Sequence, residues 1–322
     1  VVEDIKKGSF KPVYLFYGEE AYLKQQYKNR LKNAVLPEGD TINLSIYSGK
    51  GIDVKEMIAQ ADTMPFFAEH RLLLIEDSGF FKNANQQLAE YIPSIPEETI
   101  MLFVESEVDK RGKLYKAVSK KGSVVEFTAQ NEQTLTRWIL GILKTEGKMI
   151  TSGAMKQFLE KTGTDMERIR QELEKLICYC MEKESITEED VAVICSEQTE
   201  NKIFDMINAM AEKKQKKAME LYYDLLALKE PPMRILYLIT RQFNLLMQVK
   251  ELSEEGYSAK TISERLKMAG FIVRNCLRQA EYFSLKTLKE ALQDCVRMEE
   301  AVKTGRMNDV MSVELLLVKY SS

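Results

Sequence analysis

The sequence of 322 residues contains one histidine, His70, and none of its five cysteines lies in a Cys-x-x-Cys pair. Without further histidines or paired thiols, the usual ligand sets for zinc cannot be assembled, so we expect no metal site. The same shortage excludes Ser/His/Asp and Cys/His nucleophilic sets beyond any that use His70. The sequence therefore predicts neither a zinc protein nor a hydrolase of these classes, and it indicates no bound cofactor.

Long apolar runs are also missing. The longest, such as residues 71–75 (RLLLI), are far shorter than the roughly 20 residues that a membrane helix needs. The first ten residues, VVEDIKKGSF, lack the apolar core of a secretory signal. The odd number of cysteines, in helical surroundings, is typical of reduced thiols in a protein core. We therefore expect a soluble, cytoplasmic protein with no membrane contact.

Short apolar runs alternate with helical stretches in the first part of the chain. This alternation predicts an α/β fold with a parallel sheet and helices on both faces. After residue 128 the strand signals stop and only helices are expected, one of them starting at the capping-box spacing of Thr187 and Asp190. The expected strands cover residues 12–17, 41–47, 71–76, 99–105 and 123–127.

The length suggests two or three domains of roughly 100–150 residues each. We predict an α/β domain over residues 1–140, a small helical domain over 141–210 and a larger helical domain over 211–322. The last of these carries 19 Lys and Arg against 15 Asp and Glu, although the whole chain has a formal net charge of −3. This basic excess is a mild hint of a polyanion nearby, but a solvated helical surface of mixed charge is the more common cause of so small an excess.

The turn after the first expected strand lies where P-loop enzymes place the phosphate loop G-x-x-x-x-G-K-[ST]. Gly18 and Lys24 have the required separation, but Leu23 replaces the second glycine and Gln25 replaces the hydroxyl that binds magnesium. Two glutamates follow Gly18, whereas a phosphate loop needs bare backbone amides and a positive field. We therefore expect this degenerate loop not to bind nucleotide.

Residues 72–77, LLLIED, have the form of a Walker B strand, with four apolar residues and then two acids. In an ATPase such acids hold the Mg²⁺ shell and orient water. Because the preceding loop cannot supply a nucleotide, we interpret these acids as polar residues at the end of a buried strand.

The connection between the helix expected over residues 54–62 and the strand over 71–76 reads DTMPFFAEH from residue 62. Pro65 fixes φ and lacks a backbone donor, so we expect a kink. Phe66 and Phe67 are adjacent, so a regular element could bury only one of them well. Two large apolar side chains on a short connection are candidate anchors for a pocket on a partner. Alternatively, both fold back onto the sheet, and the pattern alone does not decide between the two.

In combination, these features resemble the delta subunits of the bacterial DNA polymerase III clamp loader, in the form found in low-G+C Gram-positive bacteria. The resemblance covers essentially the whole chain and depends on five stretches that occur in the family's order. These are residues 13–20 (VYLFYGEE), 64–76 (MPFFAEHRLLLIE), 170–176 (RQELEKL), 201–204 (NKIF) and 302–306 (VKTGR).

The resemblance implies an AAA+-like, RecA-like α/β domain followed by two all-α domains, a small lid and a collar that joins other loader subunits. It implies a subunit of a DNA-directed DNA polymerase (nucleotidyltransferase) holoenzyme that acts in DNA replication and has no catalytic activity as an isolated chain. The implied partners are the sliding clamp (beta), the gamma/tau and delta-prime subunits in a heteropentamer, and primed DNA through the assembled loader.

The resemblance also implies that two apolar residues just before the Walker-B-like strand enter a pocket on the clamp and open its ring. In this sequence the pair is Phe66 and Phe67, with Met64 and Pro65 shaping the segment. Phe66 departs from the leucine that better-known relatives carry as the first residue of the pair.

Two other functions stay open on the sequence alone. An active AAA+ ATPase would need residues 18–25 to bind nucleotide, and would be recognised by Mg-ATP binding with turnover. A helical scaffold protein unrelated to replication would purify without clamp or loader subunits.

Overall fold

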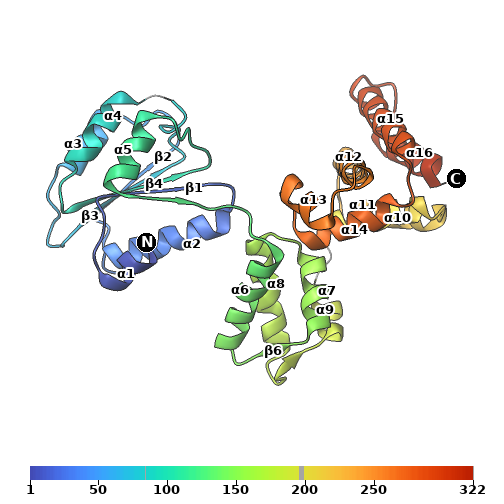
Figure 1. Ribbon diagram of the computed structural model, residues 1–322, viewed down its shortest axis with the longest axis horizontal. Coiled ribbons are helices and arrows are strands. Elements are labelled where there is room, and N and C mark those ends of the chain that lie inside the picture. The colour runs from blue at the N-terminus through green and yellow to red at the C-terminus, as the bar shows by residue number, and fades with distance from the viewer. Residues whose placement is uncertain (84, 196–198, 322) are drawn as a thin grey trace. The chain divides into compact units, whose positions relative to one another are not determined.

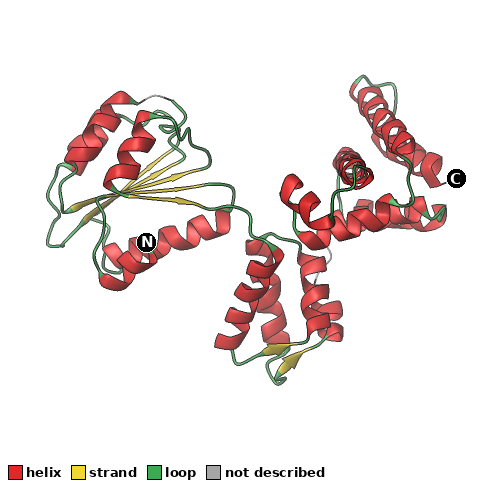
Figure 2. Cartoon of the chain, viewed as in Figure 1, coloured by secondary structure: helices red, strands yellow, loops and turns green. Residues whose placement is uncertain are grey.

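The computed structural model describes residues 1–83, 85–195 and 199–321. The chain divides between Ala129 and Gln130 into two compact units. In the described residues the first unit is α/β and the second is almost entirely helical (Figures 1 and 2). The division into three domains, with boundaries at residues 140 and 210, stays a prediction.

The first unit is built on a parallel sheet. Its strands are β1 Val13–Tyr17, β2 Leu44–Ser48, β3 Arg71–Glu76, β4 Thr99–Glu105 and β5 Ser123–Glu126. Among the described residues they form one sheet in the order β2-β3-β4-β1-β5, with every neighbouring pair parallel. This order places β2 at one edge and confirms the predicted parallel α/β fold.

Helices cover both faces of this sheet. They are α1 Val2–Lys7, α2 Ala21–Val35, α3 Val54–Ala61, α4 Gln86–Tyr91, which continues into the short 3₁₀ helix η1 Ile92–Ser94, and α5 Lys113–Lys121. Alternate side chains of a strand point to opposite faces. Leu15 of β1 packs in a cluster with residues of α3, α4 and α5, whereas Phe16 packs in a second cluster with residues of α1 and α2. The central strands are therefore buried on both sides, and Figure 1 shows the helices on the two faces of the sheet.

The second strand begins at Leu44, three residues later than predicted. The Asp40 carboxylate accepts hydrogen bonds from the backbone amides of Ile42 and Asn43, each at 3.0 Å. These bonds turn the chain before the strand can begin, which is the usual effect of an aspartate side chain that bonds to the backbone two residues ahead.

The second unit begins with four helices, α6 Glu132–Thr145, α7 Ser152–Thr162, α8 Met166–Tyr179 and α9 Glu188–Ile194. Thr187 and Asp190 form the predicted capping box at the start of α9. The prediction that strands end at residue 128 is wrong, because β6 Met149–Ile150 pairs with β7 Ser185–Ile186. Two residues are too few to give an alternating apolar pattern, so the sequence carries no signal for this pair.

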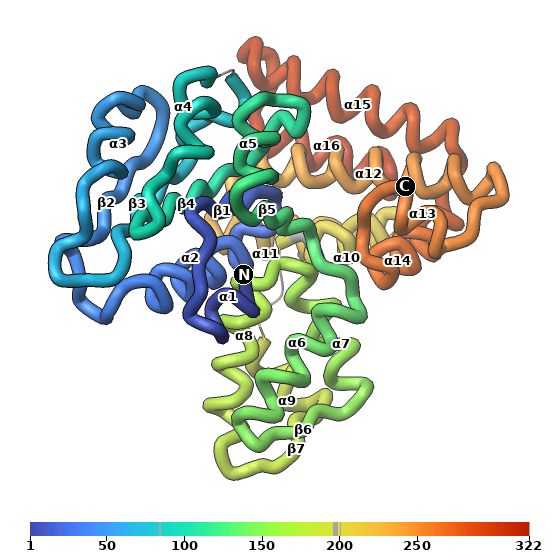
Figure 3. The backbone as a smooth tube through the Cα atoms, turned by 60° about the vertical axis from the view of Figure 1, so that its left-hand side comes forward, coloured from blue at the N-terminus to red at the C-terminus, as the bar shows by residue number. Residues whose placement is uncertain are grey.

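The rest of the second unit is a helical bundle. Its helices are α10 Thr199–Ala211, α11 Gln215–Ala227, α12 Pro232–Glu254, α13 Ala259–Leu266, α14 Gly270–Ala280, α15 Leu285–Lys303 and α16 Asp309–Ser321. One apolar core holds them together, and α15 runs beside α12 and α16 (Figure 3). The fold class of an α/β region followed by all-α regions is thus as predicted.

The cysteines are free, and all except the exposed Cys178 are buried. The prediction of core thiols is therefore wrong for Cys178. Burial raises the pKa of Cys276 and of Cys295 to about 11. Among the described residues, no group of three or more His, Cys, Asp or Glu side chains could hold a metal ion. None of the described helices is both long and apolar enough to cross a membrane.

Candidate functional site

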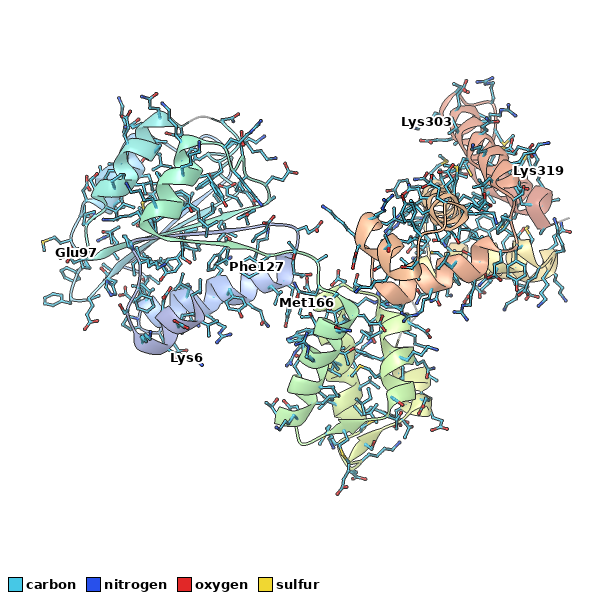
Figure 4. All side chains as sticks on the ribbon, viewed as in Figure 1. Lys6, Glu97, Phe127, Met166, Lys303 and Lys319 are labelled. Carbon is cyan, nitrogen blue, oxygen red and sulfur yellow. The ribbon has the colours of Figure 1, made fainter. Side chains whose placement is uncertain are left out.

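The turn after β1 bonds to its own chain. The Gly18 amide donates to the Ser106 carbonyl at 3.3 Å, and the Glu20 amide donates to the Phe127 carbonyl at 3.1 Å. The Glu20 carboxylate in turn accepts from the Tyr22 amide at 3.3 Å. Figure 4 labels Phe127 just beyond β5, where its ring packs against Tyr27 of α2. A phosphate loop keeps such amides free to face the ligand, and here they are engaged internally.

Two other positions of the degenerate loop, Lys24 and Leu23, also contact the rest of the fold. Lys24 Nζ donates to the carbonyl of Glu105 at 3.2 Å, and burial lowers the pKa of Lys24. Leu23 packs partly against the apolar cluster on the α2 face, and Gln25 is exposed. That the loop does not bind nucleotide stays a prediction.

The acids at the end of β3 have partners within the chain. Glu76 forms an ion pair with the buried Lys28 at 2.7 Å. Asp77 accepts a hydrogen bond from Ser106 Oγ at 3.0 Å. In a working Walker B strand these oxygens would face the magnesium shell. Their partners here favour the interpretation of a polar strand end.

We expect Mg-ATP not to bind the isolated chain with a Kd below about 1 mM. The reason is that the loop amides and Lys24 already bond to Ser106, Phe127 and Glu105. Isothermal titration of the full chain with Mg-ATP measures this directly. Micromolar binding with turnover would instead make the chain an active ATPase.

The segment between α3 and β3 presents its large apolar side chains to solvent. Met64 is 80% exposed, Phe66 57% and Phe67 95%, while Pro65 is half-buried. The two phenylalanine rings meet edge to face, with centroids 4.6 Å apart. The alternative in which both rings fold back onto the sheet is therefore wrong. Exposed aromatic pairs are costly to solvate and are the kind of side chain that fills a partner's pocket.

The backbone of this segment is held by a side chain from another part of the sequence. Asn43 Oδ1 accepts a hydrogen bond from the Phe66 amide at 2.7 Å, and Asn43 Nδ2 donates to the Phe66 carbonyl at 3.0 Å. Asn43 Nδ2 also donates to Asp40 at 2.8 Å, and hydrogen bonds from Asn43 lower the pKa of Asp40. We call Asp40 and Asn43 the clasp. The sequence does not single it out, because residues 43 and 66 are far apart along the chain.

Two further apolar side chains near the sheet edge were missed by sequence reasoning. Ile42, next to Asn43, is 64% exposed, and Ile46 of the edge strand β2 is 58% exposed. The alternation of residues 41–47 predicted a strand but not that these residues would lie at the open edge. Ile42 thus adds apolar surface beside Asn43, which holds the aromatic segment, and Ile46 adds apolar surface on the edge strand.

A cavity of about 630 Å³ lies at the carboxyl ends of β2, β3 and β4. Carboxyl ends of parallel strands are a common place for ligands. Its buried acid, Glu105, accepts hydrogen bonds from the Ser78 and Gly79 amides and from the Ser78 hydroxyl, and burial raises the pKa of Glu105. These bonds tie the carboxylate to its own chain, so the aromatic segment remains the stronger candidate site.

Comparison with known proteins agrees with this architecture. The family model for "DNA polymerase III, delta subunit" matches residues 14–128, and that for "DNA polymerase III delta subunit, C-terminal domain" matches residues 200–320. The chain is similar to the DNA polymerase III subunit delta of Bacillus subtilis (strain 168), with 30% identity over 331 residues, 99% of this chain and 95% of that protein.

Two further similarities point the same way. The probable DNA polymerase III subunit delta of Aquifex aeolicus (strain VF5) is 21% identical over 257 residues, which is 76% of this chain and 72% of that protein. The solved structure of the Bacillus subtilis DNA clamp loader delta protein superimposes with a TM-score of 0.70 at 30% identity. That superposition covers 99% of this chain and 98% of the other.

Proposed function

Because the chain belongs to the family of DNA polymerase III delta subunits, we propose that it binds the sliding clamp and opens the clamp ring for loading onto primed DNA. The contact is made by Met64, Pro65, Phe66 and Phe67. The observation that carries this proposal is the exposure of both phenylalanines, 57% and 95%, on a segment whose backbone is tied to the sheet.

The chemistry of such a contact is burial of apolar surface. An aromatic side chain that is solvated in the free protein and buried in the complex stabilises the complex mainly because its apolar surface is removed from water. Phe66 and Phe67 each offer a ring with few rotatable bonds, so little side-chain entropy is lost on binding. The segment therefore suits an apolar pocket on the clamp surface.

Ring opening follows if the segment binds the two states of the clamp unequally. A ligand shifts an equilibrium only by its differential affinity for the two states. The chain must therefore bind the open or strained ring more tightly than the closed ring. In the assembled loader, ATP is bound and hydrolysed by other subunits, whose change of shape makes the segment available to the clamp.

The remaining partners are proposed from the family. The C-terminal helices, over residues 211–322, join the gamma/tau and delta-prime subunits in a heteropentamer. Their excess of Lys and Arg, 19 against 15 acids, faces primed DNA within that assembly.

Neutralising the lysines of residues 211–322 should then reduce the loader's affinity for DNA and the salt dependence of that affinity. Unchanged DNA affinity and salt dependence would argue against the DNA contact, not against clamp binding.

The clamp contact is tested by titrating the full chain with a fluorescently labelled sliding clamp from the same organism, without nucleotide. We expect saturable binding by the isolated chain, because it needs no ATP of its own to present an exposed segment. Absence of binding at clamp concentrations up to about 100 μM, equivalent to a free energy weaker than about −5.5 kcal/mol, would reject the proposal.

A further inference from the structure

The Asn43 side chain satisfies both backbone groups of a residue that lies outside any strand or helix. Its carbonyl oxygen accepts from the Phe66 amide at 2.7 Å, and its amide nitrogen donates to the Phe66 carbonyl at 3.0 Å. This pair of bonds copies the exchange that a neighbouring strand would make with Phe66. Asn43 is 2% exposed, so water competes poorly for its polar atoms.

The orientation of the Asn43 amide is fixed by Asp40. A carboxylate only accepts hydrogen bonds, so the NH₂ group of Asn43 must face Asp40 Oδ2, at 2.8 Å. That leaves the Asn43 oxygen for the Phe66 amide. The clasp thus has one arrangement that satisfies all its donors and acceptors.

A third hydrogen bond, from another side chain, anchors the start of the segment. Arg71 Nη2, on β3, donates to the Met64 carbonyl at 3.3 Å. The Arg71 side chain is buried, and its Nε and Nη1 have no hydrogen-bond partner among the described residues. Release of the segment would leave the buried guanidinium without this bond as well, which is unfavourable. Met64 and Phe66 are therefore both tied to the sheet.

Phe67 follows directly and has φ of +52°. This left-handed backbone conformation costs about 1–2 kcal/mol for a residue with a Cβ. It occurs where neighbouring structure determines it, and such strain is frequent in segments that bind partners. Because the clasp fixes Phe66, the residue directly before Phe67, it restrains the Phe67 backbone in this conformation. In this conformation the Phe67 ring is 95% exposed.

We propose that Asn43, oriented by Asp40, is a positioning residue that holds Phe66 and Phe67 in the arrangement that enters the clamp pocket. This inference depends on the proposed function. Without the clasp the segment samples other conformations, and the apparent affinity falls by the fraction of time spent in the competent one. Asn43 acts through the segment and does not itself touch the clamp.

The test is Asn43→Ala in the full chain. We expect clamp affinity to fall about tenfold, with most of the loss in the association rate, because fewer molecules present the competent segment. We also expect the Phe66 amide to exchange its hydrogen at least about tenfold faster, while amides in the middle of β3 keep their protection. The matched control is Asn85→Ala, which removes a similar side-chain bond, 3.0 Å to the Leu88 amide at the start of α4, and should leave clamp affinity unchanged.

The readouts separate this inference from the proposed function. If Asn43→Ala leaves Phe66 exchange or clamp affinity unchanged, or if Asn85→Ala weakens clamp binding equally, Asn43 is not a positioning residue. If clamp binding is absent in the unaltered chain, the proposed function itself fails. If Asn43→Ala fails to fold, amide hydrogen exchange in the unaltered chain still tests the inference. The Phe66 amide must then be protected relative to the Glu69 amide, and equal exchange at the two sites would overturn the inference.

Discussion

Replacing Phe66 and Phe67 together with alanine is expected to weaken clamp binding by about 2–4 kcal/mol or more, which is about 30-fold to 1000-fold. The reason is that, in the proposed complex, the two rings supply most of the apolar area that the clamp buries, and truncation to alanine removes it. The fold should be unaffected, because both side chains are largely exposed in the free chain. Titration with labelled clamp measures the loss, and thermal unfolding verifies that the variant is folded.

The matched control for this double variant is Tyr237→Ala with Tyr282→Ala, two aromatic side chains of the second unit that are 65% and 60% exposed. In a mixture of chain and clamp alone, these changes should leave the affinity within about twofold. Unchanged affinity of the Phe66 and Phe67 variant would contradict the assignment of the segment. Loss of binding together with unfolding would mean that the phenylalanines stabilise the fold.

Gly18→Ala is expected to destabilise the α/β unit by about 2–5 kcal/mol. Gly18 has φ of +115°, where a side chain is strongly disfavoured, and an added Cβ would collide with the carbonyl oxygen of Phe127. The first glycine of the degenerate loop is therefore required by packing against the chain after β5. Urea unfolding followed by circular dichroism measures the change.

Gly39→Ala is the control for this substitution. Gly39 also has a positive φ, +84°, but nothing lies within 4 Å of its added Cβ. It should therefore show only the backbone cost, about 1–2 kcal/mol. Equal effects of the two substitutions would show that the collision with Phe127 contributes nothing.

Two central strands, β3 and β4, could be predicted at their observed bounds, and the third, β1, begins one residue later than predicted. β3 and β4 are buried on both faces, so Arg71–Glu76 and Thr99–Glu105 read as nearly continuous apolar runs. The edge strand β2 was placed less well, because its start is set by side-chain bonds from Asp40 and not by apolar periodicity. The apolar pattern of a sequence indicates which residues are buried. It does not indicate where a polar side chain, such as that of Asp40, turns the backbone.

The candidate site was predictable only in part. The sequence identifies Phe66 and Phe67 as an unusual pair, but their exposure depends on what the surrounding segment bonds to. That information lies in Asn43 and Arg71, which reach the segment through space from an edge turn and a buried strand. Long-range polar contacts of this kind leave no periodic trace in a single sequence, and the role of the pair in clamp binding stays a prediction.

The most direct test of ring opening compares two forms of the clamp. One is the intact ring, and the other is a clamp subunit whose ring interface has been disrupted by substitution so that it cannot close. A protein that opens the ring must bind the single subunit more tightly than the intact ring. Binding to the intact ring includes the free-energy cost of opening it, and binding to the single subunit does not. The account predicts tighter binding of the full chain to the single subunit, lost in the Phe66→Ala, Phe67→Ala variant. Equal or weaker binding to the single subunit would contradict it.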